Sequence, residues 1–255
     1  MPDTPGRPFV SIITATFNAA SELPATAASL AALHKQSFEW IIVDGGSTDD
    51  TMGVVGRNSD LIAYSRSEPD AGIYDAWNKA LAVAKGEWIS FLGAGDLYRP
   101  GALDRYADGI KVAAARGDAP LEYVSSRVQL MKDGRPIRVI GQPWEWRSFR
   151  NWMTVAHVGS LHHRSLFEGG ARFDTSYKIT GDYEFLLRKT SRLRTAFVDS
   201  ITAEMLAGGN SDSLVRATRE AERAKRSVGA RNPIVLRAQR YVALVKAGVR
   251  RQVWY

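Results

Sequence analysis

Short apolar runs alternate with helical patterns over the first half of the chain. The apolar runs are residues 9–16, 40–43, 61–65 and 87–92. Runs of this length that are rich in β-branched and aromatic residues predict strands buried on both faces, as in a parallel sheet. Between them, residues 21–33 and 73–85 carry apolar side chains at helical spacing. This alternation predicts an α/β fold with a mostly parallel central sheet flanked by helices.

The pattern changes after residue 120. Residues 123–130 and 135–140 are two β-prone runs around Lys132-Asp133-Gly134, which predicts a hairpin. A helix is expected from Asp182 to about Arg192, followed by a strand over residues 195–198. The two halves of the chain are therefore predicted to differ in their order of strands and helices.

Charge is distributed unevenly along the chain. The 255 residues include 34 Lys and Arg and 27 Asp and Glu, a formal net charge of +7. Residues 213–255 hold eleven of the basic residues and only two acids, which leaves residues 1–212 at −2 and residues 1–120 at −5. We therefore expect a body at 1–212, with halves at 8–120 and 121–212, and a basic tail at 213–255.

The tail has an amphipathic pattern in its last part. Asn232-Pro233 is typical of the start of a helix, and apolar side chains then recur at helical spacing with Arg and Lys between them. Such a helix, closed by Trp254 and Tyr255, is typical of a segment that lies on an anionic membrane surface. The alternative is that the apolar face of residues 232–255 packs on the body or on a second subunit, so oligomers stay open.

Composition excludes several classes of protein. The chain has no cysteine, which removes disulfides, thiolate catalysis and cysteine-ligated metal sites. It has no run of 18 apolar residues and no apolar core within residues 1–8, so we expect neither a membrane-spanning helix nor a secretory leader. Nucleic acid is not expected as a partner, because the near-neutral body offers no basic surface to phosphates.

Small and polar residues follow each predicted strand of the first half. These segments are 14–18, 44–47, 68–72 and 93–96. Because parallel strands end at one edge of a sheet, we expect the segments to converge on one binding site. Glycines allow a ligand close to the backbone, and carboxylates can accept hydrogen bonds from a base or hold a cation near phosphates. This chemistry suits a nucleotide diphosphate, and the missing Walker and Gly-x-Gly-x-x-Gly motifs disfavour an ATPase or a dehydrogenase.

Four motifs in these segments resemble those of family 2 glycosyltransferases, a group of inverting enzymes with the GT-A fold. Residues 10–18 and 42–51 resemble the first two strands of that family with their nucleotide loops. Residues 68–80 match the long motif of a subgroup, ahead of residues 86–89. The resemblance covers roughly residues 8–205 and indicates an enzyme of the type that builds bacterial surface polysaccharides.

The resemblance implies a GT-A nucleotide-diphospho-sugar transferase fold with a C-terminal helical extension. Ala15, Phe17 and Asp44 would surround the base, and Asp70 and Gly72 would line the sugar-nucleotide pocket. The implied donor-binding residues are Ala15, Thr16, Phe17, Asn18, Asp44, Gly45, Gly46, Asp70, Gly72 and Asn78. The implied partners are a nucleotide-diphosphate sugar and a glycan or lipid-linked glycan whose hydroxyl accepts the sugar.

Asp96 takes the last position of the family's metal-binding Asp-x-Asp motif. Family members often have two adjacent acids, whereas this chain has Gly95-Asp96. The implied cofactor is Mg²⁺ or Mn²⁺, held against the diphosphate by one carboxylate, which a hard cation with phosphate and water ligands tolerates. Alternatively, Asp96 caps a helix that begins after Pro100 and Gly101.

An inverting transfer needs a base opposite the leaving nucleotide, which takes the proton of the acceptor hydroxyl as its oxygen attacks. Asp182, within residues 180–188, resembles the family's acidic motif at the start of a helix and is the candidate catalytic residue. The alternative is that Asp182 only caps this helix and favours its dipole. Glu184 is the fallback base.

Two more side chains are candidates for contacts with the acceptor or the diphosphate. His157 matches a histidine often found before the acceptor-side helix of the family, although a single histidine can equally be structural. Trp152 closes an aromatic stretch, whose other members are Trp144, Trp146 and Phe149. These rings can form a platform for a sugar or a lipid-linked acceptor, or they can belong to the core of a lid over the sheet.

Two alternatives to an inverting glycosyltransferase stay open. A sugar nucleotidyltransferase would carry a glycine-rich basic loop after the first strand, and residues 14–20 contain no Gly, Lys or Arg. A non-catalytic nucleotide-sugar-binding or scaffold protein is favoured by Gly95 and disfavoured by Asp96 and Asp182. The expected location is the cytoplasm or, through residues 232–255, the cytoplasmic face of the inner membrane.

Overall fold

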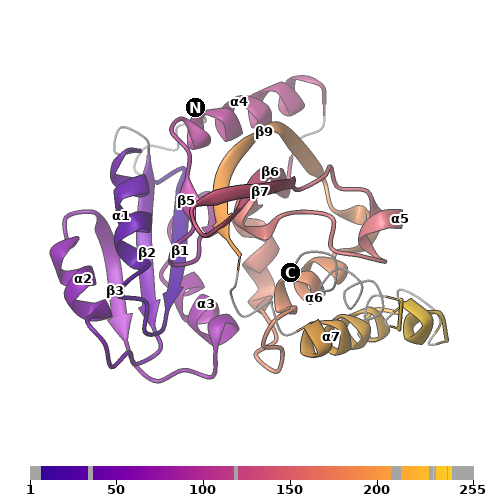
Figure 1. The fold of residues 1–255 in the computed structure, drawn as a ribbon. Helices are drawn as coiled ribbons and strands as arrows, with labels where there is room; N and C mark the ends of the chain where they lie inside the picture. Colours follow the sequence, from indigo (N-terminus) through magenta and orange to yellow (C-terminus); the bar gives the residue numbers. More distant parts are fainter. Residues whose placement is uncertain are drawn as a thin grey trace.

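A curled, nine-stranded sheet organises the molecule (Figure 1). The computed structural model describes residues 7–33, 37–117, 120–207, 214–229, 232, 234–239 and 241–242. Over these residues the strand order is β3-β2-β1-β4-β8-β6-β9-β5, and β7 pairs with β6. The expected α/β class is confirmed, but the sheet is mixed rather than mostly parallel.

The first half of the sheet is parallel, as predicted. β1 (Val10–Thr16) lies between β2 (Phe38–Asp44) and β4 (Trp88–Phe91), and β3 (Ile62–Ser67) pairs with the outer edge of β2. The interior of β1 and β2 is almost fully buried, which explains their unbroken apolar runs. Because all four strands run the same way, their carboxyl ends lie at one edge.

Helices cover both faces of these strands. On β1, Ile12 belongs to the core shared with α1 (Leu23–Ala31) and α2 (Thr51–Arg57), whereas its neighbour Ile13 belongs to the core shared with α3 (Ile73–Leu81). This is the alternation of side chains expected along a strand. Both predicted helices are confirmed, and both are about one turn shorter than their apolar patterns.

The second half adds antiparallel pairs. β8 (Ser160–His163) lies between β4 and β6 (Tyr123–Lys132) and is antiparallel to both, and β7 (Arg135–Ile140) completes the predicted hairpin with β6. β9 (Thr195–Leu206) is parallel to β6, and β5 (Leu97–Tyr98) pairs with its far end. The strand predicted at 195–198 is therefore much longer.

Helices and short 3₁₀ turns connect the strands of the second half. α4 (Ala102–Ala115) lies along β9 at the top of Figure 1. The others are α5 (Trp146–Phe149), α6 (Gly181–Leu187) and the 3₁₀ turns η1 (His157–Gly159), η2 (Arg164–Gly170) and η3 (Thr190–Arg192). The helix predicted from Asp182 to Arg192 thus ends early, and a separate 3₁₀ turn follows it.

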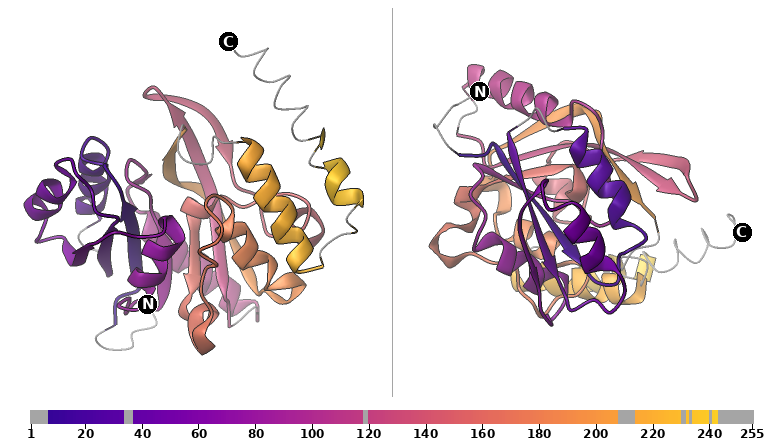
Figure 2. Two further views of the ribbon diagram at one scale, coloured as in Figure 1. Left: turned by 90° about the horizontal axis from the view of Figure 1, so that it is seen from below. Right: turned by 90° about the vertical axis from the view of Figure 1, so that its left-hand side faces the viewer.

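The first helix of the predicted tail packs on the body. α7 (Leu214–Ser227) lies beside α6, at the end of the molecule opposite β3 (Figure 2). The Glu220 carboxylate on α7 accepts hydrogen bonds from the backbone N–H groups of Lys178, Ile179 and Thr180, directly before α6. α7 therefore holds the start of α6 in place.

Little of the predicted terminal helix lies within the described residues. The Asn232 side chain accepts a hydrogen bond from the Ile234 N–H, as expected of a helix cap. Residues 243–255, with the closing aromatic pair, lie outside the described part of the chain. None of the helices within that part combines the length and hydropathy needed to cross a bilayer.

Candidate active site

A cavity of about 650 Å³ lies at the carboxyl ends of the parallel strands, a volume typical of small-molecule sites. The segments after β1, β2, β3 and β4 all contribute to its walls, so the expected convergence is confirmed. The lining residues are Ala15, Thr16, Phe17, Asn18, Ala19, Glu22, Gly45, Asp70, Gly72, Ile73, Gly93 and Ala94. Seven of the ten predicted donor-binding residues are among them.

The loop after β1 presents an exposed aromatic ring to this cavity. Asn18 has a left-handed backbone with φ of 48°, and its side-chain oxygen accepts a hydrogen bond from the Thr48 N–H at 2.9 Å. The Asn18 N–H donates to the Ser47 hydroxyl at 2.8 Å. These bonds fix the turn in which Phe17 is 66% exposed. An exposed ring at a cavity wall offers a flat surface for a base.

Asp44 lies beneath the cavity rather than in its wall. Its carboxylate is fully buried and accepts hydrogen bonds from the hydroxyls of Thr16, Ser47 and Ser67 and from the N–H groups of Gly46 and Ser47. Burial alone would raise the pKa of Asp44, but these bonds together lower it below its ordinary value. The resemblance implies contact between Asp44 and the base. In the structure, Asp44 is buried and does not line the cavity.

Gly45 and Asp70 form part of the wall together. A Cβ atom on Gly45 would lie 2.9 Å from Asp70 Oδ2, so only glycine leaves room for this carboxylate. Asp70 Oδ1 accepts a hydrogen bond from the Gly72 N–H at 2.7 Å, which orients the group. The absent side chain at position 45 thus lets a carboxylate from the next loop reach the cavity.

Besides Asp44, two further predicted donor-binding residues, Gly46 and Asn78, do not line the cavity. The Asn78 amide donates to the Phe173 carbonyl at 2.9 Å and accepts from the Phe173 N–H at 3.0 Å. It therefore joins α3 to the second half of the chain. Gly46 occupies the turn after β2, where its φ of 83° favours glycine. Asn78 therefore links two parts of the fold, and Gly46 forms the turn after β2.

The predicted metal ligand, Asp96, is only 8% exposed and does not line the cavity. Its Oδ1 accepts a hydrogen bond from the Leu206 N–H at 2.9 Å, and burial raises the pKa of Asp96 to about 7. The alternative capping role is wrong, because α4 begins at Ala102 and its cap position is Gly101.

The second acid of the family motif would be strained in this chain, because the φ of 90° at Gly95 favours glycine. A Cβ atom on Gly95 would lie 2.6 Å from Leu206 Cδ1 and 3.3 Å from Glu22 Cβ. Within the described residues, no group of three or more Asp, Glu and His side chains is arranged to hold a metal ion. The residues fit only a cation that one carboxylate shares with phosphate and water oxygens.

Asp182 lies in the first turn of α6, against the second residue of α3. The Tyr74 hydroxyl is 2.7 Å from the Ile179 carbonyl and 3.2 Å from Asp182 Oδ1. Burial and the nearby Asp182 carboxylate raise the pKa of Tyr74, so its hydroxyl stays a donor. A Cβ atom on Gly181 would lie 2.8 Å from the Tyr74 ring. Glycine at 181 is therefore needed for this approach.

His157 lies behind Asp182 in a stack of rings. Its Nδ1 is 3.9 Å from Asp182 Oδ2, and its ring stacks on Trp77 and Phe91 at centroid distances of 5.1 and 5.3 Å. Burial lowers the pKa of His157 despite the nearby carboxylate, and neither ring nitrogen has a hydrogen bond to the described residues. A neutral imidazole therefore lies next to the Asp182 carboxylate.

Glu184, the fallback base, contacts Arg188 at the end of the same helix. Its side chain is buried and forms an ion pair with Arg188 at 3.0 Å. Burial raises the pKa of Glu184, although Arg188 opposes this effect. Asp182 is 15% exposed at its side chain and contacts the Tyr74 hydroxyl, which makes it the better placed of the two carboxylates.

The aromatic stretch divides between core and surface. Phe149 is fully buried, and the Trp144 ring packs against it at 4.2 Å between centroids. Trp146 also packs on this core. Trp152 is 46% exposed and lines a different cavity, beside α7. The structure therefore does not bring Trp152 and His157 together.

Some residues of the site could not be identified from the sequence pattern. Glu22 lines the cavity but lies within the apolar pattern of the first helix. The Lys178 ammonium donates to the Ala71 carbonyl, beside the wall residue Gly72, yet it belongs to a segment without periodicity. Gly93 and Ala94 could have been chosen, because they directly follow a predicted strand.

Comparisons with known proteins give a consistent result. Residues 11–116 match the family model described as Glycosyl transferase family 2. A PGL/p-HBAD biosynthesis glycosyltransferase of Mycobacterium bovis is 30% identical over 216 residues, which cover 82% of this chain and 81% of that protein.

Two solved structures share the fold at low sequence identity. Staphylococcus aureus TarS 1-349 in complex with UDP-GlcNAc has a TM-score of 0.63 and 18% identity, over 84% of this chain and 66% of that one. Glucosyl-3-phosphoglycerate synthase from Mycobacterium tuberculosis, in complex with Mn²⁺, UDP and glucosyl-3-phosphoglycerate, has a TM-score of 0.61 and 17% identity, over 88% and 80%. The chain thus spans just under two thirds of the TarS fragment.

We expect the contribution of His157 and His162 to the free energy of unfolding to fall as the pH falls below about 6.5, the ordinary histidine value. Protonation of Asp96, whose pKa is raised, acts in the opposite direction. Burial lowers the pKa of both His157 and His162, so the folded protein keeps them neutral while the unfolded chain takes up protons. Denaturant titrations at pH 7 and pH 5 measure the loss. His162→Phe keeps a ring against Phe91 and Tyr123 and should show a smaller loss; an equal loss would refute the assignment.

Proposed function

Because this chain belongs to glycosyltransferase family 2 and has the GT-A fold, we propose that it is an inverting glycosyltransferase. It transfers a sugar from a nucleotide-diphosphate donor to a hydroxyl of a glycan or lipid-linked glycan. The observation that carries this proposal is the place of Asp182. Its carboxylate contacts Tyr74, the residue that follows the cavity residues Gly72 and Ile73.

The donor binds in the cavity at the strand ends. Phe17 offers its exposed ring to the base, and Asp70 offers an acceptor to N–H or hydroxyl groups of the nucleotide. Ala15, Gly45 and Gly72 have little or no side chain, so the ligand can approach the backbone closely. The complex of TarS with UDP-GlcNAc supports a nucleotide sugar as the ligand of this fold.

The reaction proceeds by direct displacement at the anomeric carbon. The acceptor oxygen attacks that carbon from the face opposite the diphosphate, its bond to the sugar forms as the bond to the diphosphate oxygen breaks, and its proton passes to Asp182. A carboxylate in this role is a general base. Tyr74 holds one Asp182 oxygen by a hydrogen bond, and the neutral His157 places no positive charge beside it.

The leaving diphosphate needs positive charge. We assign Asp96 as the ligand of a Mg²⁺ or Mn²⁺ ion, which when bound would neutralise charge on the phosphates. The Mn²⁺ and UDP in the mycobacterial synthase support this assignment. Lys178, at the wall beside Gly72, adds a cation that this chain supplies itself.

Membrane contact through the C-terminal segment forms the last part of the proposal. In the described part of this segment, Leu236 is buried on the body, whereas Ile234 and Tyr241 are 76% and 71% exposed. One face thus packs on protein while apolar side chains face outward among the basic residues. This arrangement suits an anionic lipid surface and the cytoplasmic face of a membrane that carries the acceptor.

Asp182→Asn should lower kcat by about 10²–10⁴-fold, the usual contribution of a general base. The amide keeps the size of the side chain but cannot take the proton, so donor affinity should stay nearly unchanged. A thermal-shift screen of UDP-, GDP- and dTDP-sugars selects the donor, and a transfer assay gives kcat. Glu184→Gln is the control for a lost acid on the same helix; wild-type activity in Asp182→Asn rejects the base.

Asp96→Ala should abolish the effect of Mn²⁺ on nucleotide affinity. Calorimetry of UDP or GDP binding, with and without Mn²⁺, measures this effect in both proteins. Glu22→Ala is the control, because it removes a nearby carboxylate that lines the donor cavity, beside Gly95. If Mn²⁺ strengthens nucleotide binding equally in wild type and Asp96→Ala, Asp96 is not the ligand.

Replacing Ile234 and Tyr241 together by Ser should weaken binding to anionic liposomes without unfolding the protein, since both side chains are exposed. Co-sedimentation with vesicles containing phosphatidylglycerol measures the bound fraction. Replacing Ile137, an exposed apolar residue of β7, by Ser is the control. Equal binding by wild type and the double variant would place the membrane contact elsewhere or remove it.

A further inference from the structure

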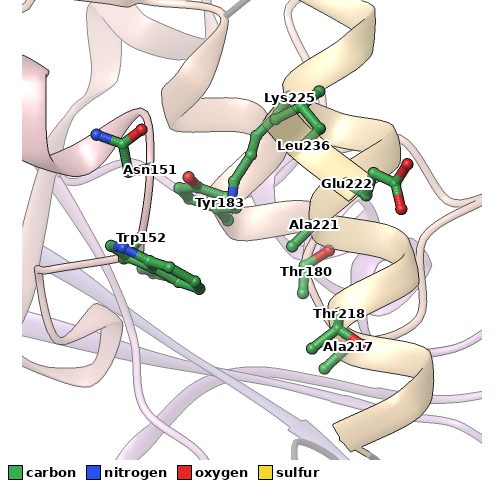
Figure 3. Close-up of a pocket in the computed structure, with 11 residues that line it drawn as sticks. Asn151, Trp152, Thr180, Tyr183, Ala217, Thr218, Ala221, Glu222, Lys225 and Leu236 are labelled. Carbon is green, nitrogen blue, oxygen red and sulfur yellow. The ribbon is translucent and has the colours of Figure 1, made fainter. Parts of the chain in front are cut away.

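A second cavity lies on the acceptor side of the molecule, apart from the donor cavity. It encloses about 200 Å³ between α6, α7 and the segment that follows α5 (Figure 3). None of its lining residues belongs to the donor cavity. In the figure, Asn151 and Trp152 lie opposite α7, and Lys225 extends from α7 toward Tyr183.

The walls of this cavity are mainly apolar and aromatic. The Trp152 and Tyr183 rings, Met153, Ala217 and Leu236 are among its lining residues. Tryptophan, tyrosine and methionine contact flat rings well, through offset or edge-to-face packing and through the polarisable sulfur. The lining therefore favours a planar apolar group over a sugar, whose hydroxyls would find few partners there.

Its volume limits what can enter. An engineered apolar cavity of about 150 Å³ is sufficient for benzene, so the 200 Å³ here suits one six-membered ring with a substituent. A nucleotide or a disaccharide is too large. The cavity therefore selects a single ring rather than the whole acceptor.

Polar side chains contribute a smaller part of the lining, from Asn151, Thr180, Thr218, Glu222 and Lys225. The Thr180 hydroxyl oxygen is buried without a hydrogen bond to any described residue, although Thr180 lines the space. The Lys225 ammonium lies 4.9 Å from the centre of the Trp152 ring and 3.4 Å from Gln239 Oε1. Since the Thr180 oxygen is buried, Lys225 rather than Thr180 is the group that a polar substituent of the bound ring would meet.

The cavity is close to the proposed base. Thr180 and Tyr183 line it, and Asp182 lies between them in the chain. Two residues span at most ~7 Å along the backbone, so the Cα atoms of Thr180 and Asp182 are no further apart than that. A ring held in the cavity can thus carry an attached sugar whose hydroxyl reaches Asp182.

We propose that this cavity binds an aromatic ring of the acceptor, so that the substrate class is a glycoside or hydroxyl compound with a phenyl-sized aglycone. This inference rests on the proposed function for the identity of the reaction. The binding itself requires neither a donor nor the catalytic step. The walls formed by Trp152, Tyr183 and Ala217 supply the affinity.

The test compares binding of phenyl β-glucoside, methyl β-glucoside and hexyl β-glucoside to the full chain, by calorimetry without donor. Phenyl β-glucoside should bind about tenfold or more tightly than the methyl compound, since burial of a ring contributes roughly 1.5–3 kcal/mol. Ala217→Leu should remove this preference by filling the cavity. Ala28→Leu, at an exposed position of α1, is the matched control and should retain it.

Three results would overturn the proposal: equal binding of the phenyl and methyl compounds, tighter binding of the hexyl compound, or an unchanged phenyl preference in Ala217→Leu. If Ala217→Leu does not fold, Trp152→Ala replaces it, because loss of an exposed wall should also remove the preference. Asp182→Asn should bind phenyl β-glucoside like the wild type. Failure of the base assignment would therefore leave this result intact, and failure of the cavity would leave transfer intact.

Discussion

Five hydrogen bonds to the buried carboxylate of Asp44 hold the donor cavity together. The donors come from the end of β1, from the turn after β2 and from the end of β3. A buried charge is tolerated only when it is fully hydrogen-bonded, so these three segments must stay in place for the carboxylate to remain there. Phe17 and Asp70 reach the cavity from loops that this arrangement positions. The shape of this cavity thus depends on a buried residue that does not belong to its lining.

The acceptor side depends on a comparable but weaker arrangement around α6. Gly181 allows the Tyr74 ring to approach, Tyr74 contacts Asp182, and Glu220 holds the backbone that leads into the helix. The same α7 helix closes the aromatic cavity. The proposed base and the proposed aglycone site therefore both depend on the packing of α7 against the start of α6. The basic C-terminal region thus has a structural role besides the proposed membrane contact.

The sequence was sufficient to predict the parallel half of the fold and the place of the donor cavity. Buried parallel strands show unbroken apolar runs, and their loops must meet at one edge. The neighbours Asp44 and Gly45 show where this approach stops. The apolar pattern places both at the end of β2. It does not predict that the Asp44 side chain is buried, nor that Asp70 occupies the space beside Gly45. The length of β9 was hidden too, because Asp199, Ser200 and Glu204 interrupt its apolar pattern.

The acceptor half was less predictable, since its contacts join distant segments. The second cavity combines residues near 152, 183 and 217, and no local periodicity links them. The central claim is inversion with Asp182 as base, and the anomeric configuration of the product tests it most directly. NMR of the transferred sugar should show the configuration opposite to that in the nucleotide donor. A product with the donor's own configuration would contradict direct displacement and, with it, the role of Asp182.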